Sequence, residues 1–217
     1  MGMAASLTHD VIQGPPPPID TGWGGGGGDG SDGRGADRRA AFTGLIVGLA
    51  ACVMVFAALT SAFVVRRGLA DMNDWVSIHK PSILFWNTGI LLLSSLLLDQ
   101  SRRALRAGER SHFNFWWTVA TGLGILFLVG QAYAWYQLKL AGVFISSNPA
   151  SSFFYVFTAA HAMHILGGVG ALLYVDVQAL RLRLGPAKRT AIDVTAIFWH
   201  FLDGLWVYLM ILFYVWG

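Results

Sequence analysis

Ionisable side chains interrupt the long apolar stretches of this 217-residue sequence. His161 and His164 are three residues apart, and His200 and Asp203 repeat that spacing further along the chain. Residues three apart share one face of a helix, and histidine is both a common metal ligand and a proton carrier near neutral pH. The pattern therefore allows three interpretations: a haem or metal site, a proton path, or a hydrogen-bonded cluster that fixes helix packing.

The set of possible ligands is small. A haem could take one histidine from each of two helices, but a di-iron site in a bundle uses several carboxylates, and Asp203 is the only acid among these residues. One acid and three histidines also make too short a chain to carry protons across a hydrocarbon core of about 30 Å. We therefore favour a structural cluster, and the sequence predicts no catalytic, cofactor-binding or metal residue in this chain.

The elements that must position these residues are long apolar runs. The chain is 55% hydrophobic and 12% charged, with a mean hydropathy of +0.55, whereas a soluble domain is about 25% charged. Five runs have the length that a membrane-spanning helix needs. They are residues 42–65, 81–98, 115–137, 153–175 and 195–216. We predict an all-α, polytopic membrane protein with five transmembrane helices in a bundle, which excludes secreted disulfide scaffolds, nucleic-acid binders and ordinary cytosolic enzymes.

The flanking segments set the expected organisation and orientation. Residues 1–39 hold a run of four prolines and a run of five glycines, which is typical of a flexible tail. Residues 40–217 form the expected transmembrane domain. Lys and Arg are more frequent on the side of the bundle that carries the N-terminal flank and the loops after the second and fourth spans. The N-terminus is thus predicted to be cytoplasmic and the C-terminus external.

Depth in the membrane predicts which polar groups meet. At a rise of about 1.5 Å per residue, Asp203, His164 and Cys52 each lie roughly 12 to 15 Å from the cytoplasmic face. We therefore expect these three in one layer, with His164 paired to Asp203 across a helix interface and His200 one turn nearer the cytoplasm. Glycines at positions 44 and 48, and at 167, 168 and 170, are expected to allow close helix contacts.

Basic and imidazole side chains outside the spans have less specific interpretations. Arginines after the second span could hold anionic lipid headgroups, or could only set the topology. They are Arg102, Arg103, Arg106 and Arg110. His9 and His112 lie in segments expected to be cytoplasmic, where they could buffer protons or be ordinary surface residues.

Four stretches resemble subunit III of the haem–copper terminal oxidases. FFYVFTAAHAMHILGG at 153–168 is similar to the family's helix with two spaced histidines, and WHFLDGLW at 199–206 to its last helix. PSILFWNTGILLLSS at 81–95 and VMVFAALTSAFVVR at 53–66 resemble two of its other helices. The resemblance covers residues 42–217 in the expected order.

The sequence departs from the family pattern in two ways. The family has a glutamate at the position where this chain has Cys52, so a role that depends on that acid is not expected here. Long members have seven helices, of which the first two stand apart and form a lipid-filled cleft. This chain matches the last five, and the resemblance implies that an extension of subunit I can supply the missing pair.

The resemblance implies an accessory, non-catalytic subunit of a cytochrome c oxidase in a bacterial cytoplasmic membrane. Such a subunit packs on subunit I, holds phospholipid, and supports proton uptake and stable turnover during reduction of oxygen to water. It carries no cofactor of its own; haem and copper are expected in subunits I and II, possible parts of a larger respiratory supercomplex. The alternatives are subunit III of a quinol oxidase, a relative associated with nitric oxide reductase, and a free-standing bis-histidine haem protein.

Overall fold

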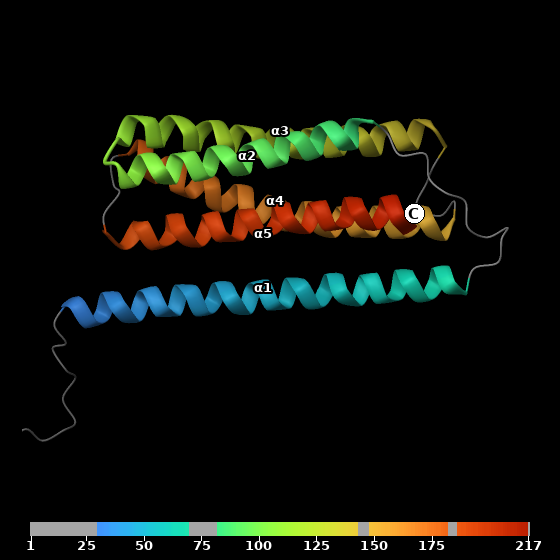
Figure 1. The fold of residues 1–217 in the computed structure, drawn as a ribbon, viewed down its shortest axis with the longest axis horizontal. Helices are drawn as coiled ribbons and strands as arrows, with labels where there is room; N and C mark the ends of the chain where they lie inside the picture. Colours follow the sequence, from blue (N-terminus) through green and yellow to red (C-terminus); the bar gives the residue numbers. More distant parts are fainter. Residues whose placement is uncertain (1–29, 70–81, 143–147, 182–185, 217) are drawn as a thin grey trace, which may run out of the picture.

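Five long helices make up the fold of the described part of the chain. The computed structural model describes residues 30–69, 82–142, 148–181 and 186–216. The helices are α1 (Gly30–Gly68), α2 (Ile83–Arg106), α3 (Arg110–Leu140), α4 (Pro149–Leu180) and α5 (Pro186–Trp216). Each is long and apolar enough to cross a membrane, and they run alongside one another (Figure 1). The predicted all-α class and the five spans are confirmed.

The helices extend beyond the apolar runs that predicted them. α1 begins at Gly30, so residues 30–39, which we assigned to the flexible tail, are helical. A helix bonds its own backbone groups and needs no apolar side chains to continue, and the Ala and Arg residues that precede the first apolar run are good helix formers. Residues 1–29 of the predicted tail lie outside the described residues.

Four of the helices close a ring, and the fifth lies against its edge. α2 packs on α3, α3 on α4, α4 on α5, and α5 on α2. Within the described ranges, α1 contacts only α4 and α5, and it lies at the edge of the bundle in Figure 1. α1 therefore lies outside the ring and packs on two adjacent ring helices.

The closest pair, α2 and α3, is joined by a short turn and by serine hydroxyls. Gly108 in the turn has φ +83°, a backbone conformation that side chains disfavour. Ser94 Oγ donates to the Ala120 carbonyl at 2.8 Å, and Ser101 Oγ to the Phe113 carbonyl at 2.9 Å. These small residues let the two backbones approach, as is common between helices in lipid.

Trp199 of α5 fills the centre of the ring between two glycines. A methyl group on Gly124 of α3 would lie 2.6 Å from the Trp199 ring, and one on Gly168 of α4 would lie 3.1 Å from it. The expected close approach at Gly168 is therefore present. At positions 44, 48, 167 and 170 an added methyl would meet nothing within 4 Å among the described residues, so close contact there with the helices of a partner stays a prediction. Spacing marks a small-residue face but does not say whether another helix covers it.

α1 is attached mainly through aromatic rings. Phe56 lies 6.4 Å from Phe157 of α4, and Phe63 lies 5.5 Å from Phe153 and 6.1 Å from Phe157, all between ring centroids. A hydroxyl pair, Thr60 Oγ1 and Tyr208 Oη at 3.0 Å, also joins α1 to α5. Most of the remaining surface of α1 is apolar and exposed.

Candidate functional site

Three polar contacts cross between α2 and α5, and we call this set the α2–α5 ladder. Trp206 Nε1 donates to Thr88 Oγ1 at 3.0 Å, Ser95 Oγ bonds His200 Nδ1, and Arg102 donates to Asp193 at 2.9 Å. The α2 residues are seven apart, and the α5 residues are seven and six apart. Side chains seven apart stay on one side of two packed helices. The sequence therefore places a continuous polar seam along this interface.

His200 is half-buried in the middle of the ladder. Its Nδ1 contacts the Ser95 hydroxyl, and Asp99 and Arg102 are the charged groups that act on it electrostatically. Asp99 in turn bonds Arg103 at 3.0 Å. The predicted place of His200, one turn from Asp203 toward the N-terminal end of α5, follows from their shared helix.

Asp203 is 3% exposed, and neither of its carboxylate oxygens has a hydrogen-bond partner among the described residues. The predicted bond to His164 is wrong, because His164 Nδ1 bonds the carbonyl of Ala160 at 2.7 Å. His164 also lies 5.6 Å from the Phe56 ring of α1. Depth placed both residues at a similar level, but depth says nothing of the direction in which each points around its helix.

His161 lies apart from the other two histidines, at the centre of the ring. It is fully buried, its ring stacks on Trp206 at 5.0 Å, and the edge of Phe127 lies 6.1 Å away. Neither ring nitrogen has a hydrogen-bond partner in the described part of the chain. The two histidines of α4 are three residues apart, yet they do not form one site. His161 packs into the ring, and His164 packs against α1.

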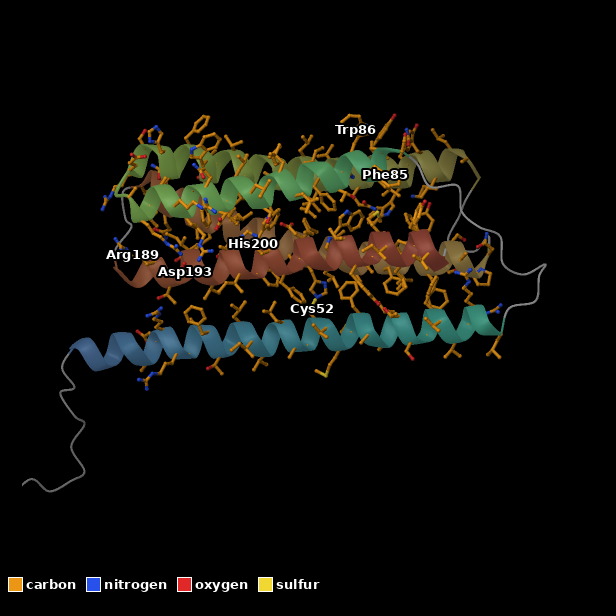
Figure 2. All side chains as sticks on the ribbon, in the orientation of Figure 1. Cys52, Phe85, Trp86, Arg189, Asp193 and His200 are labelled. Carbon is orange, nitrogen blue, oxygen red and sulfur yellow. The ribbon has the colours of Figure 1, made fainter. Side chains whose placement is uncertain are left out.

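Cys52 lies on α1 and is 3% exposed, in the same apolar core as Phe56 and Phe63. Figure 2 labels Cys52 on α1 and His200 on α5. In the ranges that the structure describes, no three His, Cys, Asp or Glu side chains lie close enough together to hold a metal ion. The residues expected in one polar layer are thus distributed over several separate contacts.

The basic residues after α2 gather at one end of the bundle. Arg102 and Arg106 of α2 line a cavity of about 170 Å³ together with Arg189 and Asp193 of α5. Arg103 pairs with Asp99, and Arg110 is exposed at the start of α3. The structure thus brings together two of the four predicted headgroup arginines and adds Arg189.

The two histidines predicted to buffer protons have different outcomes. His112 is largely exposed, and its Nδ1 lies 2.8 Å from Glu109 Oε2. His9 lies outside the described residues. A role in proton buffering stays a prediction for both.

Sequence reasoning missed one buried acid, Asp176. Asp176 is 7% exposed and accepts a hydrogen bond from Thr118 Oγ1 at 2.7 Å. It follows the predicted end of the fourth span by one residue, so a longer span would have found it. Asn87 of α2 packs against Gly130 of α3, and Gln131 is 1% exposed. Amides in apolar runs favour such packing between neighbouring helices, but their spacing does not indicate which helix each will meet.

Comparison with known proteins places this bundle in a family. The family model for cytochrome c oxidase subunit III matches residues 38–217, which include almost all of α1 and the whole of α2 to α5. The chain is 30% identical to the probable cytochrome c oxidase subunit 3 of Nocardia farcinica over 169 residues, covering 76% of this chain and 82% of the relative.

Two other relatives agree. Cytochrome c oxidase subunit 3 of Corynebacterium diphtheriae is 31% identical over 175 residues, covering 79% of this chain and 85% of the relative. The Synechocystis sp. protein of the same name is 28% identical over 179 residues, covering 79% and 74%. The five-helix membrane bundle described above therefore belongs to the cytochrome c oxidase subunit III family.

Proposed function

We propose that this chain is the accessory, non-catalytic subunit III of a respiratory oxidase complex that reduces oxygen to water. The observation that carries the proposal is the family match, which extends over most of α1 and the whole of α2 to α5. In this proposal haem and copper belong to subunits I and II. This chain packs on subunit I, holds phospholipid, and supports proton uptake and stable turnover.

The division of the bundle into a ring and an edge helix supports a packing role. α1 exposes large apolar side chains along much of its length, among them Ile46, Val47 and Met54. In a membrane such a surface is suited to lipid or to the apolar helices of a larger subunit. We therefore place subunit I or its boundary lipid on the exposed side of α1.

The polar residues inside the bundle fit a structural purpose. His161 packs between aromatic rings, His164 bonds its own helix, and Cys52 lies in the apolar core. His200 joins α5 to α2. In lipid, where apolar burial does not drive helices together, such contacts determine which faces of the helices meet.

The arginines at one end of the bundle support lipid binding. Arg102, Arg106 and Arg189 line one cavity, so their charges combine at a single place on the surface. With the N-terminus in the cytoplasm, this end faces the cytoplasmic leaflet, where anionic lipids attract basic side chains. The bacterial relatives favour the cytoplasmic membrane as the location.

Affinity purification of the tagged full-length chain in mild detergent tests the proposal. We expect the haem- and copper-bearing oxidase subunits to co-purify, with an optical spectrum that disappears when the partners are removed. A parallel preparation from untagged cells controls for contaminating oxidase. Purification without partners and with a Soret band of its own would contradict the proposal, and so would partners of a nitric oxide reductase.

A further inference from the structure

A small charged cavity lies between the end of α2 and the start of α5. Its volume is about 170 Å³, and its charged lining residues are Arg102, Arg106, Arg189 and Asp193. Figure 2 shows the two that belong to α5, Arg189 and Asp193, near the start of that helix. Three guanidinium groups and one carboxylate give the lining a net charge of +2. Positive charge gathered in a concave site attracts anions.

Arg102 is the oriented member of this lining. Its guanidinium donates to Asp193 at 2.9 Å, and a carboxylate oxygen of Asp99 lies 3.9 Å from it. Its side chain is 18% exposed, and its Nε–H is buried without a hydrogen-bond partner among the described residues. A guanidinium that two carboxylates already hold in place loses little side-chain entropy when a further acceptor binds.

The other two arginines bring positive charge that no acid of the bundle balances. Arg106 and Arg189 are both exposed, and neither has an ion-pair partner within the part of the chain that the structure describes. The acid of the lining, Asp193, already accepts from Arg102. An anion that enters the cavity therefore meets two unpaired guanidinium groups and one oriented one.

The size of the cavity limits what that anion is. Pockets for nucleotides and other drug-sized ligands begin at roughly 300 Å³, so this cavity is too small for them. It has the volume of about five or six water molecules, which suits a single small oxyanion group. Guanidinium forks match the oxygens of a phosphate in pairs. A phosphate group therefore fits both the volume and the donors.

The level of the cavity along the bundle points to a lipid phosphate. The apolar run of the second predicted span ends at residue 98, and that of the fifth begins at residue 195. The charged lining residues lie two to eight positions outside these limits, which is about 3 to 12 Å beyond the hydrocarbon core. The headgroup layer of a bilayer is about 5 to 8 Å thick on each side. The arginines thus lie at headgroup level.

The rest of the lining agrees with a lipid. Leu105 of α2 and Ile192 of α5 complete it, so apolar side chains adjoin the guanidinium groups. The glycerol and upper acyl carbons of a lipid gain from contact with such side chains, whereas a free inorganic phosphate gains nothing from them. The mixed lining therefore favours an amphipathic ligand.

We propose that this cavity binds the phosphate group of an anionic lipid headgroup, through Arg106 and Arg189 with Arg102 as the third donor. The bound phosphate bridges the ends of α2 and α5, next to the exposed contact of the α2–α5 ladder. A headgroup with net negative charge is favoured over a zwitterionic one, whose own cation offsets the attraction of the arginines.

The inference rests on the proposed function, because that function places this end of the bundle at a membrane surface. It adds a location, a ligand class and the residues that bind it. The binding itself belongs to this chain, whichever partners it has.

Lipid titration of the purified complex tests the site. After detergent has removed bound lipid, phosphatidylglycerol, phosphatidylcholine and inorganic phosphate are added in separate titrations. Native mass spectrometry counts the lipids retained, and thermal unfolding reports the stabilisation that a bound ligand gives. We expect phosphatidylglycerol to bind at least about tenfold more tightly than phosphatidylcholine, and inorganic phosphate up to millimolar concentration not to compete.

The variants assign the binding to the cavity. Arg106→Gln combined with Arg189→Gln should weaken the binding of phosphatidylglycerol at least about tenfold, because two charge-assisted contacts are lost. Each single variant should show part of this loss. Both side chains are exposed, and the single variants decide the question if the double variant does not assemble.

Arg103→Gln is the matched control. Arg103 is on the same helix, next to Arg102, and is 71% exposed, but it pairs with Asp99 and does not line the cavity. The substitution removes the same charge from the same end of the bundle. It should change the affinity for phosphatidylglycerol less than about twofold.

Three results would overturn the proposal. Equal weakening by Arg103→Gln and Arg106→Gln would show a diffuse attraction of charges instead of a site. Equal affinity for phosphatidylglycerol and phosphatidylcholine would remove the anionic lipid as the ligand. Competition by inorganic phosphate would assign the cavity to a free anion. None of these results depends on which subunits co-purify, so the site and the proposed function can fail separately.

Discussion

Two interfaces of the same chain are built from different chemistry. α5 meets α2 through hydroxyl, imidazole, indole and charged groups at three heptad-spaced positions. α1 meets α4 and α5 through phenylalanine rings and one hydroxyl pair. Directional bonds fix the register of two helices, whereas stacked rings tolerate small sliding and rotation. We therefore expect the ring of α2 to α5 to be rigid and α1 to be the helix that can be displaced.

The largest expected effect comes from removing an aromatic ring of the α1 interface. Phe56→Ala loses the contacts with Phe157 and His164 and should destabilise the attachment of α1 by about 3 kcal/mol, as buried Phe→Ala changes do. Spin-label distances from α1 to α4 should broaden, while those between α2 and α5 stay sharp.

Met54→Ala is the control for this change, because Met54 is on the same helix and 66% exposed. It should leave both distances unchanged in detergent. Equal broadening within the ring after Phe56→Ala would contradict the comparison.

Two glycine substitutions compare how tightly the interior of the ring and α1 are packed. Gly124→Ala places a methyl group 2.6 Å from the Trp199 ring and should cost about 1 to 3 kcal/mol through overpacking. Gly48→Ala meets nothing within 4 Å in the described structure and should be neutral or slightly stabilising, because Ala favours helix over Gly. The midpoint of thermal unfolding measures both, and a loss at Gly48 similar to that at Gly124 would show that α1 is packed as tightly as the ring.

A double-mutant cycle measures the strength of the Arg102–Asp193 ion pair at the exposed end of the ladder. Arg102→Met, Asp193→Asn and the combined variant should give a coupling energy of up to about 1 kcal/mol, since the ion pair is partly open to solvent. The coupling should fall as salt is added. A coupling that salt does not change would mean that the pair is shielded from water.

The smallest effect is expected for the hydroxyl pair of α1. Thr60→Val removes the bond to Tyr208 and should cost about 0.6 kcal/mol, the average for such bonds between membrane helices. Tyr208→Phe should give the same value, because it removes the other half of the pair. A much larger loss for either variant would make this bond, rather than the rings, the main attachment of α1.

The number and order of the helices were predictable, but α1 and α5 begin well before the predicted spans, at Gly30 and Pro186. A helix must have about 20 apolar residues to cross the membrane, so the apolar runs of the sequence indicate the spans. The ends were harder, because helices continue into polar segments. Residues 30–39 and Asp176 are helical although both lie outside the predicted spans.

The partners of the polar residues were not predictable. His164 and Asp203 were expected to pair because their depths agree, yet His164 bonds its own backbone and Asp203 has no hydrogen-bond partner among the described residues. Ser95 itself was present in the sequence as one of two adjacent serines. Nothing in that pair indicated that Ser94 would bond α3 and Ser95 would bond α5.

The sequence by itself determined the class of protein, the helices and the family, because each depends on residue types along one chain. Only the tertiary structure decided which side of each helix faces which neighbour. That choice depends on volumes and directions summed over the whole bundle, such as Trp199 between Gly124 and Gly168. A rotation of one helix by a single residue's angle, about 100°, would leave the apolar pattern acceptable to lipid and yet break every bond of the α2–α5 ladder.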